Sequence, residues 1–329
     1  MKKGLSLFVV VLLVILAAGY GISAKSRPGD VRVLKLAHSL NTEHPVHKTM
    51  EYMAELVKEK SHGRLIIQIF PSEQLGTEKE CIEALQLGYM GMTKISSAVM
   101  ESFVPKMRVF DMPYLFRDSE HFWKAASGPI GKELLEAGAA KGLKGLCYYD
   151  AGARSFYAKK EIDSPEDLRG MKIRVMKSIM LMEMVKKMGG SPTPMAWGEL
   201  YTSLEQGVVD AAENNPPSFE TSRHYEVCRY YTLDEHVRVP DVLVISNRVW
   251  NNLTPEFQRI LQEAVDESVV YNRKLWKEAE DASLEKVKAA GVKIIYPDKK
   301  PFKESVQPMW DEYRNSELGG LIDEIQGIE

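Results

Sequence analysis

The chain has 329 residues, of which 44% are hydrophobic and 27% charged, and its formal net charge at pH 7 is −3. This is the composition of a soluble globular protein that is long enough to bury two cores. Because the sequence has no basic run or patch, we expect neither nucleic acid nor an anionic membrane surface as a partner, and recognition of an anion would need a few local donors.

The N-terminal residues have the pattern of a secretory signal peptide. Lys2 and Lys3 precede an apolar run over residues 5–18, and residues 22–24 offer a small residue at a cleavage point. The apolar run is shorter than the roughly 20 residues that span a bilayer. The sequence therefore predicts cleavage of residues 1–24 and a periplasmic protein, with an uncleaved N-terminal anchor as the alternative.

From residue 31 the pattern alternates between strand and helix. Residues 31–37 and 65–70 have the composition of strands, and apolar residues at helical spacing over 46–57 predict a helix between them. A capping box at residues 77–80 begins a second helix, and residues 92–96 resume an extended run. This alternation predicts the α/β class, with parallel strands joined by crossover helices.

The next predicted strand, residues 143–150, leads into a glycine-containing loop that carries Arg154. A short helix follows, capped by Ser164 with Pro165 at its first position. Ligands of α/β proteins bind beyond the carboxyl ends of strands, and loops there carry functional residues. Arg154 is therefore a candidate binding residue, with a surface charge near the hinge as the alternative.

Arg174 lies inside an apolar strand, and this is the most informative feature of the chain. Period-two alternation places Ile173 and Val175 on one face of the strand and Arg174 on the other. A guanidinium held on a short strand suits a carboxylate, because its planar fork of donors matches both carboxylate oxygens and stays charged. An arginine at the surface or in an ion pair is the alternative.

The run of residues after Arg174 carries a family resemblance. An amphipathic helix over residues 178–188 ends at a glycine pair and is followed by SPTPMAWGELYTSLEQGVVDAAENNPP, residues 191–217. This run resembles the signature of the solute-binding proteins of TRAP transporters, the DctP-like periplasmic receptors of organic acids. The resemblance continues at residues 71–76, 112–116 and 251–256, so it covers nearly the whole mature chain.

The resemblance implies a two-lobed periplasmic-binding-protein-like fold with a cleft between the lobes. Residues 254–290 form an uninterrupted helical pattern, which would span about 50 Å and so should bridge both lobes. By resemblance, lobe I is residues 25–151 plus about 240–278, and lobe II is residues 152–239 plus about 279–329. The chain should cross between the lobes near 150–152 and near 239–244.

The resemblance also assigns roles to residues of the second lobe. It implies that Arg174 clamps the ligand carboxylate and that Arg154 makes a second contact to it. Asn214 matches an asparagine that lines the cleft, and Trp197 lies where relatives carry an aromatic ring that stacks on the ligand, although a core tryptophan is equally compatible. Asn215 is a further candidate, or a turn residue before the two prolines.

Residues of the first lobe indicate what kind of acid is bound. His38 and Glu73 are expected to face the cleft. Lys94 and Asp241 are further polar candidates at strand ends, with a position on the solvated surface as the alternative. A carboxylate such as Glu73 does not suit a bare dicarboxylate, but it can accept hydrogen bonds from paired hydroxyl groups. We therefore favour a sugar acid such as a hexuronate over a C4-dicarboxylate or sialic acid.

The sequence predicts neither a metal site nor a cofactor. Cys81, Cys147 and Cys228 lack metal-ligand spacing, and most of them should be buried free thiols, although one disulfide is compatible with an oxidising compartment. His44 and His47 are expected at the start of a helix rather than around a metal.

The predicted function is an extracytoplasmic receptor that closes on a carboxylate ligand and delivers it to the small and large integral membrane subunits of a TRAP transporter. A receptor of an ATP-driven importer and a secreted sugar-acid lyase are the alternatives. No nucleophile elbow, HExxH motif or phosphate-binding loop supports an enzyme. The short tail after residue 300 favours a monomer.

Overall fold

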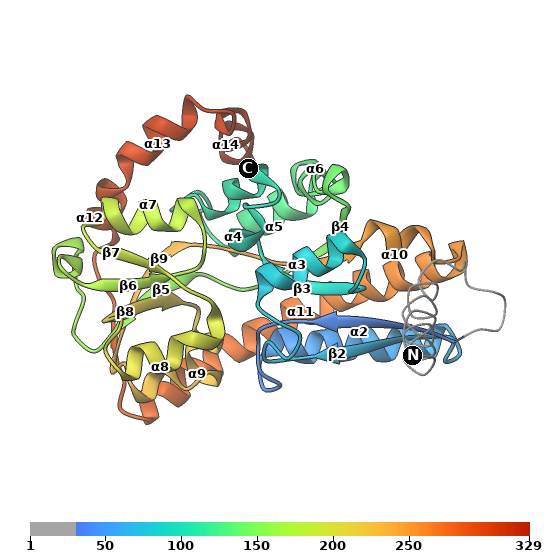
Figure 1. Ribbon diagram of the computed structural model, residues 1–329. Helices are drawn as coiled ribbons and strands as arrows, with labels where there is room; N and C mark the ends of the chain where they lie inside the picture. Colours follow the sequence, from blue (N-terminus) through green and yellow to red (C-terminus); the bar gives the residue numbers. More distant parts are fainter. Residues whose placement is uncertain (1–30) are drawn as a thin grey trace, which may run out of the picture.

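The computed structural model describes residues 31–329 and contains two β-sheets, each covered by helices (Figure 1). The predicted signal peptide lies outside the described residues. Among residues 31–329, no helix is both long and apolar enough to cross a membrane. The mixed α/β class and the two-lobed architecture predicted from the sequence are confirmed.

The first sheet has five strands in the order β2-β1-β3-β10-β4. β1 pairs in parallel with β2 and β3, whereas β10 is antiparallel to both of its neighbours. Its strands are β1 (Arg32–Ala37), β2 (Leu65–Phe70), β3 (Met92–Ser96), β4 (Leu143–Tyr149) and β10 (Asp241–Ser246). β10 therefore returns late in the chain to the centre of the first lobe.

The second sheet has six strands in the order β11-β9-β5-β8-β6-β7. Its strands are β5 (Arg154–Ala158), β6 (Lys172–Val175), β7 (Ser191–Pro194), β8 (Ala211–Asn214), β9 (Tyr230–Val237) and β11 (Lys293–Ile295). β6 is parallel to β7 and β8, and β5 is antiparallel to β8 and β9. This pairing brings Arg154, Arg174 and Asn214 onto neighbouring strands.

The helices predicted over residues 46–57, from residue 77, at residue 164 and over residues 178–188 are present, together with others that the sequence analysis did not name. Along the first part of the chain they are α2 (Pro45–Lys60), α3 (Glu78–Leu87), α4 (Ser97–Met100), α5 (Ser119–Ser127), α6 (Pro129–Glu136) and the 3₁₀ helices η1 (Pro105–Asp111) and η2 (Ala139–Lys141). The second lobe contains η3 (Pro165–Leu168), α7 (Ile179–Lys187), η4 (Trp197–Glu199), α8 (Leu200–Glu205), α9 (Pro216–Thr221) and η5 (His224–Glu226). The capping box of α3 is present, with Thr77 accepting from the Glu80 backbone amide.

Two strand connections and one long helix join the lobes. The chain leaves β4 for β5 over residues 150–153, and it leaves β9 for β10 over residues 238–240. After the short helix α10 (Asn247–Asn251), helix α11 runs from Pro255 to Ala289 and packs against α2 in the first lobe and α9 in the second (Figure 1). This confirms the predicted helix that spans the hinge.

The C-terminal tail returns to the first lobe. Its helices are α12 (Lys299–Ser305), α13 (Gln307–Arg314) and α14 (Gly319–Gln326), which form an arch over the molecule (Figure 1). The Tyr313 hydroxyl donates to Glu183 on α7 at 2.8 Å, whereas the His121 ring on α5 contacts the Ile325 carbonyl at 2.8 Å. The tail therefore lies along both lobes, whereas the sequence analysis assigned residues 279–329 to the second lobe alone.

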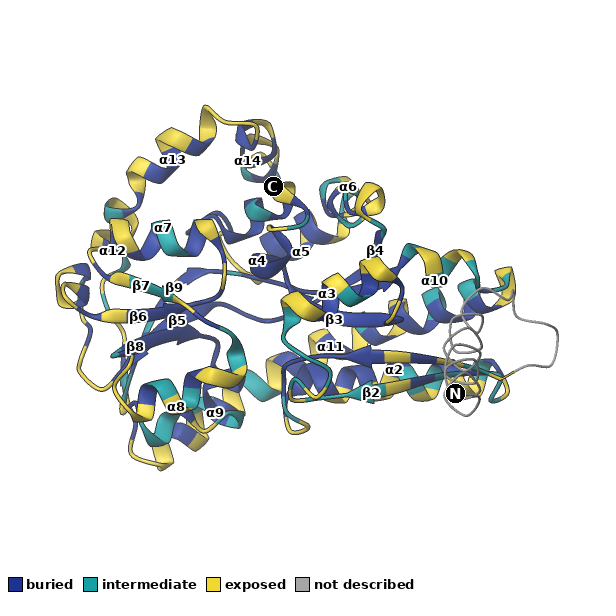
Figure 2. Ribbon diagram, viewed as in Figure 1, coloured by how far each residue is buried: buried dark blue, intermediate teal, exposed yellow. Residues whose placement is uncertain are grey.

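The strands of both sheets are buried, and the outward helix faces are exposed (Figure 2). One apolar cluster is continuous between the lobes, because it contains Phe110 and Phe122 as well as Ile173 and Met184. Two further apolar clusters belong to one lobe each. The cluster of the first lobe includes residues of β1 and α2, and that of the second lobe includes residues of β5 and β9. The three cysteines are buried and free in the structure, Cys81, Cys147 and Cys228.

Candidate functional site

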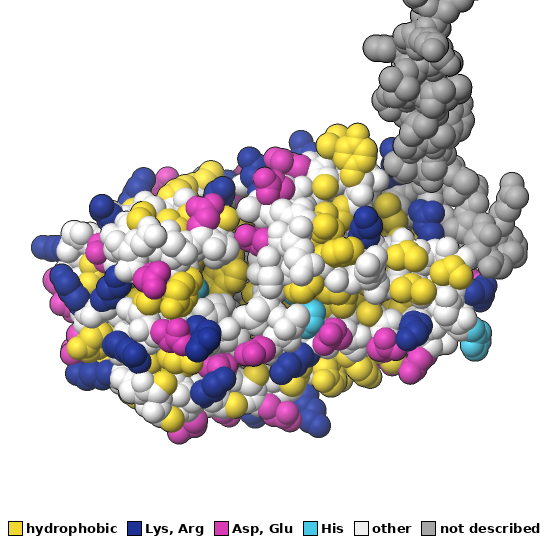
Figure 3. Space-filling view, turned by 60° about the horizontal axis from the view of Figure 1, so that its bottom comes forward, with side chains coloured by type: hydrophobic (Ala, Val, Ile, Leu, Met, Phe, Trp, Pro, Cys, Tyr) yellow, Lys and Arg dark blue, Asp and Glu magenta, His cyan; other side chains and the backbone are white. Residues whose placement is uncertain are grey.

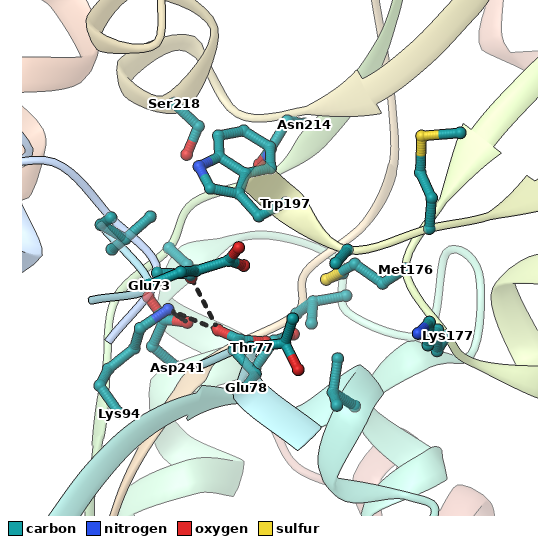
Figure 4. Close-up of a pocket in the computed structure, with 18 of the residues that line it drawn as sticks. Glu73, Thr77, Glu78, Lys94, Met176, Lys177, Trp197, Asn214, Ser218 and Asp241 are labelled. Atoms are coloured by element: carbon teal, nitrogen blue, oxygen red, sulfur yellow. Dashed lines mark hydrogen bonds and ion pairs between the residues drawn. The ribbon is translucent and has the colours of Figure 1, made fainter. Parts of the chain in front are cut away.

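A cavity with about 670 Å³ of empty space lies between the two lobes (Figure 4). This volume is in the range of small-molecule sites. Eight of the nine predicted site residues line it, namely Glu73, Lys94 and Asp241 from the first lobe and Arg154, Arg174, Trp197, Asn214 and Asn215 from the second. On the face of the molecule that Figure 3 shows, basic and acidic side chains are interspersed, so this face offers no extended basic patch to an anion.

Arg174 is buried in the cavity wall, with 2% of its surface exposed. Its Nε and Nη2 donate to the Met195 carbonyl at 3.2 and 3.0 Å, and its guanidinium lies 5.5 Å from the centre of the Trp197 ring. Its Nη1 is buried and has no hydrogen-bond partner among the described residues. A buried donor without a partner is costly, so this atom suits an anionic ligand.

Burial lowers the pKa of Arg174, since the charged form is penalised in a dry environment. Two acidic groups oppose this effect, Tyr157 first and Glu213 second. No carboxylate of the described chain forms an ion pair with Arg174. A bound carboxylate would supply the charge that the protein itself does not place there.

Arg154 also lines the cavity, but the protein already pairs its guanidinium. Its Nε and Nη2 donate to the Glu213 carboxylate at 2.5 and 3.0 Å, and its Nη1 donates to Asn214 Oδ1 at 2.8 Å. The network fixes the side chain of Asn214 at the end of β8. The contact of Arg154 with the ligand, expected from the sequence, stays a prediction, and Glu213 is a partner that the sequence did not indicate.

Two further buried groups complete the charge balance behind Arg154. Burial by itself would raise the pKa of Glu213, but Arg154 and His236 lower it to about 2. Burial opposes protonation of His236, yet Asp234, at 2.7 Å from its Nδ1, and Glu213 raise its pKa to about 9. At neutral pH this cluster therefore contains two carboxylates and two cations.

Trp197 and Glu73 face each other across the cavity (Figure 4). Trp197 belongs to η4 of the second lobe, and Glu73 to a first-lobe loop in which Ser72 and Glu73 have φ of 54° and 58°. Burial raises the pKa of Glu73, whereas a hydrogen bond from the Gly198 amide lowers it. The Glu73 carboxylate of the first lobe therefore lies close to the Gly198 backbone of the second.

Gly198 has no space for a side chain. A Cβ at this position would lie 2.5 Å from the Glu73 Oε2. The absence of a side chain at Gly198 therefore allows the carboxylate to approach the backbone of the second lobe.

Lys94 forms a buried ion-pair network across the floor of the cavity (Figure 4). Its Nζ lies 2.9 Å from Glu78 Oε1 and 3.0 Å from Asp241 Oδ1. Burial lowers the pKa of Lys94, but Asp241 and Glu78 outweigh this effect and raise it. The network leaves one carboxylate in excess, so this wall of the cavity presents acceptors rather than donors.

Asn215 has the turn role that was the alternative in the sequence analysis. It is the N-cap of α9, where its Oδ1 accepts from the Ser218 amide at 2.8 Å and its Nδ2 donates to the Ala151 carbonyl at 2.9 Å. This second bond ties α9 to the crossing between β4 and β5. Asn215 therefore shapes the cavity wall through its backbone and cap.

His38 does not line the cavity, although the sequence analysis placed it there. Its Nε2 lies 2.9 Å from His47 Nδ1, and its Nδ1 accepts from the Leu40 amide at 3.1 Å. Burial and the nearby charge of Lys94 lower the pKa of His38 to about 2. The side chain is therefore neutral and belongs to the packing between β1 and α2. His44 caps α2, as expected for the start of a helix.

Several cavity residues could not be identified from the sequence. They include Ser39, Thr77, Glu78, Met176, Lys177 and Ser218. Glu78 lies in the first turn of α3, where an acidic residue is typical of a helix start and so gives no sign of a binding role. Ser218 bonds to the ring of His44 at 3.1 Å, and such a contact between residues 174 positions apart leaves no pattern in the sequence. Within residues 31–329, no group of three candidate metal ligands is present.

The family is shown by comparison with known proteins. Residues 36–316 match the family described as bacterial extracellular solute-binding protein, family 7, DctP. The chain belongs to this DctP family. Members of this family are solute-binding receptors rather than enzymes, and this chain has the role of a TRAP-type solute receptor.

Two solved structures and one further DctP protein illustrate the similarity. A TRAP periplasmic solute-binding protein from Xanthobacter autotrophicus Py2 with bound β-D-galacturonate is 41% identical, with a TM-score of 0.87 over 90% of this chain and all of that one. Another from Roseobacter denitrificans, with bound β-D-glucuronate, is 35% identical with a TM-score of 0.87, and covers 90% of this chain and 100% of that one. The C4-dicarboxylate-binding periplasmic protein DctP of Rhodobacter capsulatus is 31% identical over 85% of this chain and 86% of that protein.

Proposed function

We propose that this DctP protein binds a hexuronate or a closely related sugar acid in the cavity between its lobes. The observation that carries this proposal is Arg174, whose buried Nη1 has no partner in the described chain and whose guanidinium forms no ion pair. A ligand carboxylate accepts from Nη1 and neutralises the guanidinium. The arginine in turn rejects neutral ligands, because they leave its charge buried and unpaired.

The opposite wall of the cavity supports a polyhydroxylated ligand. Glu73, Glu78 and Asp241 bring three carboxylates, against one buried lysine, to the side that faces Arg174. These oxygens accept hydrogen bonds from sugar hydroxyl groups but repel a second ligand carboxylate. A C4-dicarboxylate carries a charge at both ends and therefore suits this cavity less well. The ligands of the Xanthobacter and Roseobacter proteins support the same class.

Trp197 provides the apolar surface of the proposed site. Its ring lies beside Arg174 and over the cavity, where one face of a pyranose ring can stack on it (Figure 4). Asn214, held by Arg154, is within the same wall and can contact either the carboxylate or an adjacent hydroxyl group. Lobe closure around the ligand would bury all of these contacts together.

The partners and the location form part of the proposal. We infer a periplasmic protein, exported by a cleaved signal peptide over residues 1–24, that acts as a monomer and delivers its ligand to small and large TRAP membrane subunits. The periplasmic members of the family support this location. Neither nucleic acid nor a cofactor has a role in this function.

A binding screen tests the ligand class. Purified protein is titrated calorimetrically with D-galacturonate, D-glucuronate, succinate and D-galactose, the last of which has the galacturonate ring without its carboxyl group. We expect saturable binding of one or both uronates, much weaker binding of succinate, and none of galactose. Recovery of unchanged uronate after incubation separates a receptor from a lyase. Galactose binding as tight as uronate binding would refute the proposal.

A further inference from the structure

A second cavity, away from the interlobe site, is lined by basic side chains. It has about 600 Å³ of empty space and lies where the loop after η1, the end of β9 and the start of α12 meet. Four arginine and lysine side chains line it, Arg117, Arg238, Lys299 and Lys303, together with one carboxylate, Glu235, and the ring of His236, which is paired with Asp234. On a chain with a net negative charge, such a local excess of cations is unexpected.

Two of these cations have no carboxylate partner in the described chain. Arg238 is half-buried and forms neither a hydrogen bond nor an ion pair there. Burial raises the pKa of Glu280 to about 7 although the charge of Arg238 opposes this rise, and no ion pair joins the two side chains. Lys303 lies over the Tyr114 ring, 5.5 Å from its centre, and likewise has no ion-pair partner among residues 31–329.

The other two cations are partly engaged. Lys299 pairs with Glu235, the only carboxylate that lines the described cavity. Arg117 donates to the carbonyls of Gln326 and Ile328 at 3.3 and 2.5 Å. Carbonyl oxygens leave the charge of a guanidinium uncompensated, so the arginine and lysine side chains that line this cavity exceed its one carboxylate by three.

The backbone around the cavity is held in an uncommon conformation. Tyr114 and Glu235 have φ of 56° and 49°, in the left-handed region that non-glycine residues rarely adopt. The Tyr114 amide donates to the His236 carbonyl at 2.8 Å, which fixes the loop from the first lobe against the end of β9. Strained residues of this kind persist where surrounding contacts hold them, and they gather at binding sites.

We propose that this basic cavity is a second binding site, specific for a small oxyanion of the phosphate type. Such an anion presents several oxygens, so it can accept from Arg238 and Lys303 together, and from Arg117 in addition. It would bridge the loop of the first lobe and α12 of the second. A phosphate group can come from the free ion or from an anionic lipid headgroup, and both share this chemistry.

Equilibrium dialysis with labelled inorganic phosphate, at ionic strength held constant with sodium chloride, tests the site. The variant is the double substitution Arg238→Gln with Lys303→Gln. Its matched control is Lys160→Gln with Lys187→Gln, two exposed lysines that line neither cavity. We expect phosphate to bind the wild type and the control alike, and to bind the double variant at least about tenfold more weakly.

Arg174→Ala separates the two sites, because it alters only the interlobe cavity and should leave phosphate binding at the basic cavity unchanged. Sedimentation with phosphatidylglycerol vesicles distinguishes the sources: binding that needs Arg238 and Lys303 but is absent for free phosphate assigns the site to a headgroup. Unfolding curves of each variant verify that it is folded. Phosphate and vesicle binding that is absent, or equal in the wild type and the double variant, would overturn the proposal.

Discussion

Replacing Arg174 removes a buried donor, Nη1, that lies in the wall of the interlobe cavity and has no partner among the described residues. In Arg174→Ala, a ligand carboxylate would lose its buried guanidinium partner, and Arg154 could not replace it, since Arg154 is already paired with Glu213. Truncating one member of a buried, hydrogen-bonded charge pair costs about 2–5 kcal/mol, which corresponds to a roughly thirty-fold to several-thousand-fold loss of affinity. Arg174→Lys keeps the charge but loses the planar fork, so we expect a loss of about ten- to a hundred-fold.

Calorimetric titration with D-galacturonate measures both losses. Arg223→Ala is the control, because Arg223 is exposed and lies outside the cavity. The ligand-free variants should unfold at nearly the same temperature as the wild type. The hydrogen bonds of Arg174 to the Met195 carbonyl stabilise the ligand-free protein, but the cost of its buried Nη1, which has no partner among the described residues, offsets them. If Arg174→Ala binds galacturonate with wild-type affinity, Arg174 does not hold the carboxylate.

Three further predictions concern the cavity wall and the buried charges. Glu73→Gln should weaken galacturonate binding about tenfold but leave succinate binding unchanged or stronger, because only the sugar donates to this carboxylate; equal losses for both ligands would contradict this role. Gly198→Ala places a Cβ against the Glu73 carboxylate and should weaken binding, whereas Gly320→Ala, which has open space around it, should not; calorimetry compares the two. Because folding raises the pKa of His236 from 6.5 to about 9, its stabilisation is complete below pH 6.5 and is lost as pH rises through about 9, whereas that of Glu213 is lost only as pH falls towards 2. Urea unfolding at pH 6 and pH 9 should therefore show a loss of stability in the wild type that is smaller in His236→Asn, and parallel curves would refute this linkage.

The fold could be predicted from the sequence largely because local signals agreed with one another. The capping box at Thr77, the period-two pattern around Arg174 and the long helical run over 254–290 each define an element without any knowledge of its neighbours. The path of the tail could not be predicted, because contacts such as that between His121 and Ile325 join residues about 200 positions apart.

The candidate site likewise contains residues that could be predicted from local sequence patterns and contacts that could not. Arg174 could be identified because a guanidinium within an apolar strand is rare. The pairing of Arg154 with Glu213, 59 residues later, depends on the antiparallel register of β5 and β8. The sequence analysis placed His38 in the cavity because His38 follows β1, whose end borders both the cavity and α2. In the structure, the His38 ring bonds to His47 on α2 and so lies on the α2 side.

The central claim is that Arg174 grips the carboxylate of a solute between the lobes. A crystal structure of the protein grown with D-galacturonate tests it most directly. We predict the uronate carboxylate within hydrogen-bond distance of Arg174 Nη1, with the sugar hydroxyl groups facing Glu73. A uronate bound with its carboxylate elsewhere, and Arg174 still bonded to the Met195 carbonyl alone, would contradict the account.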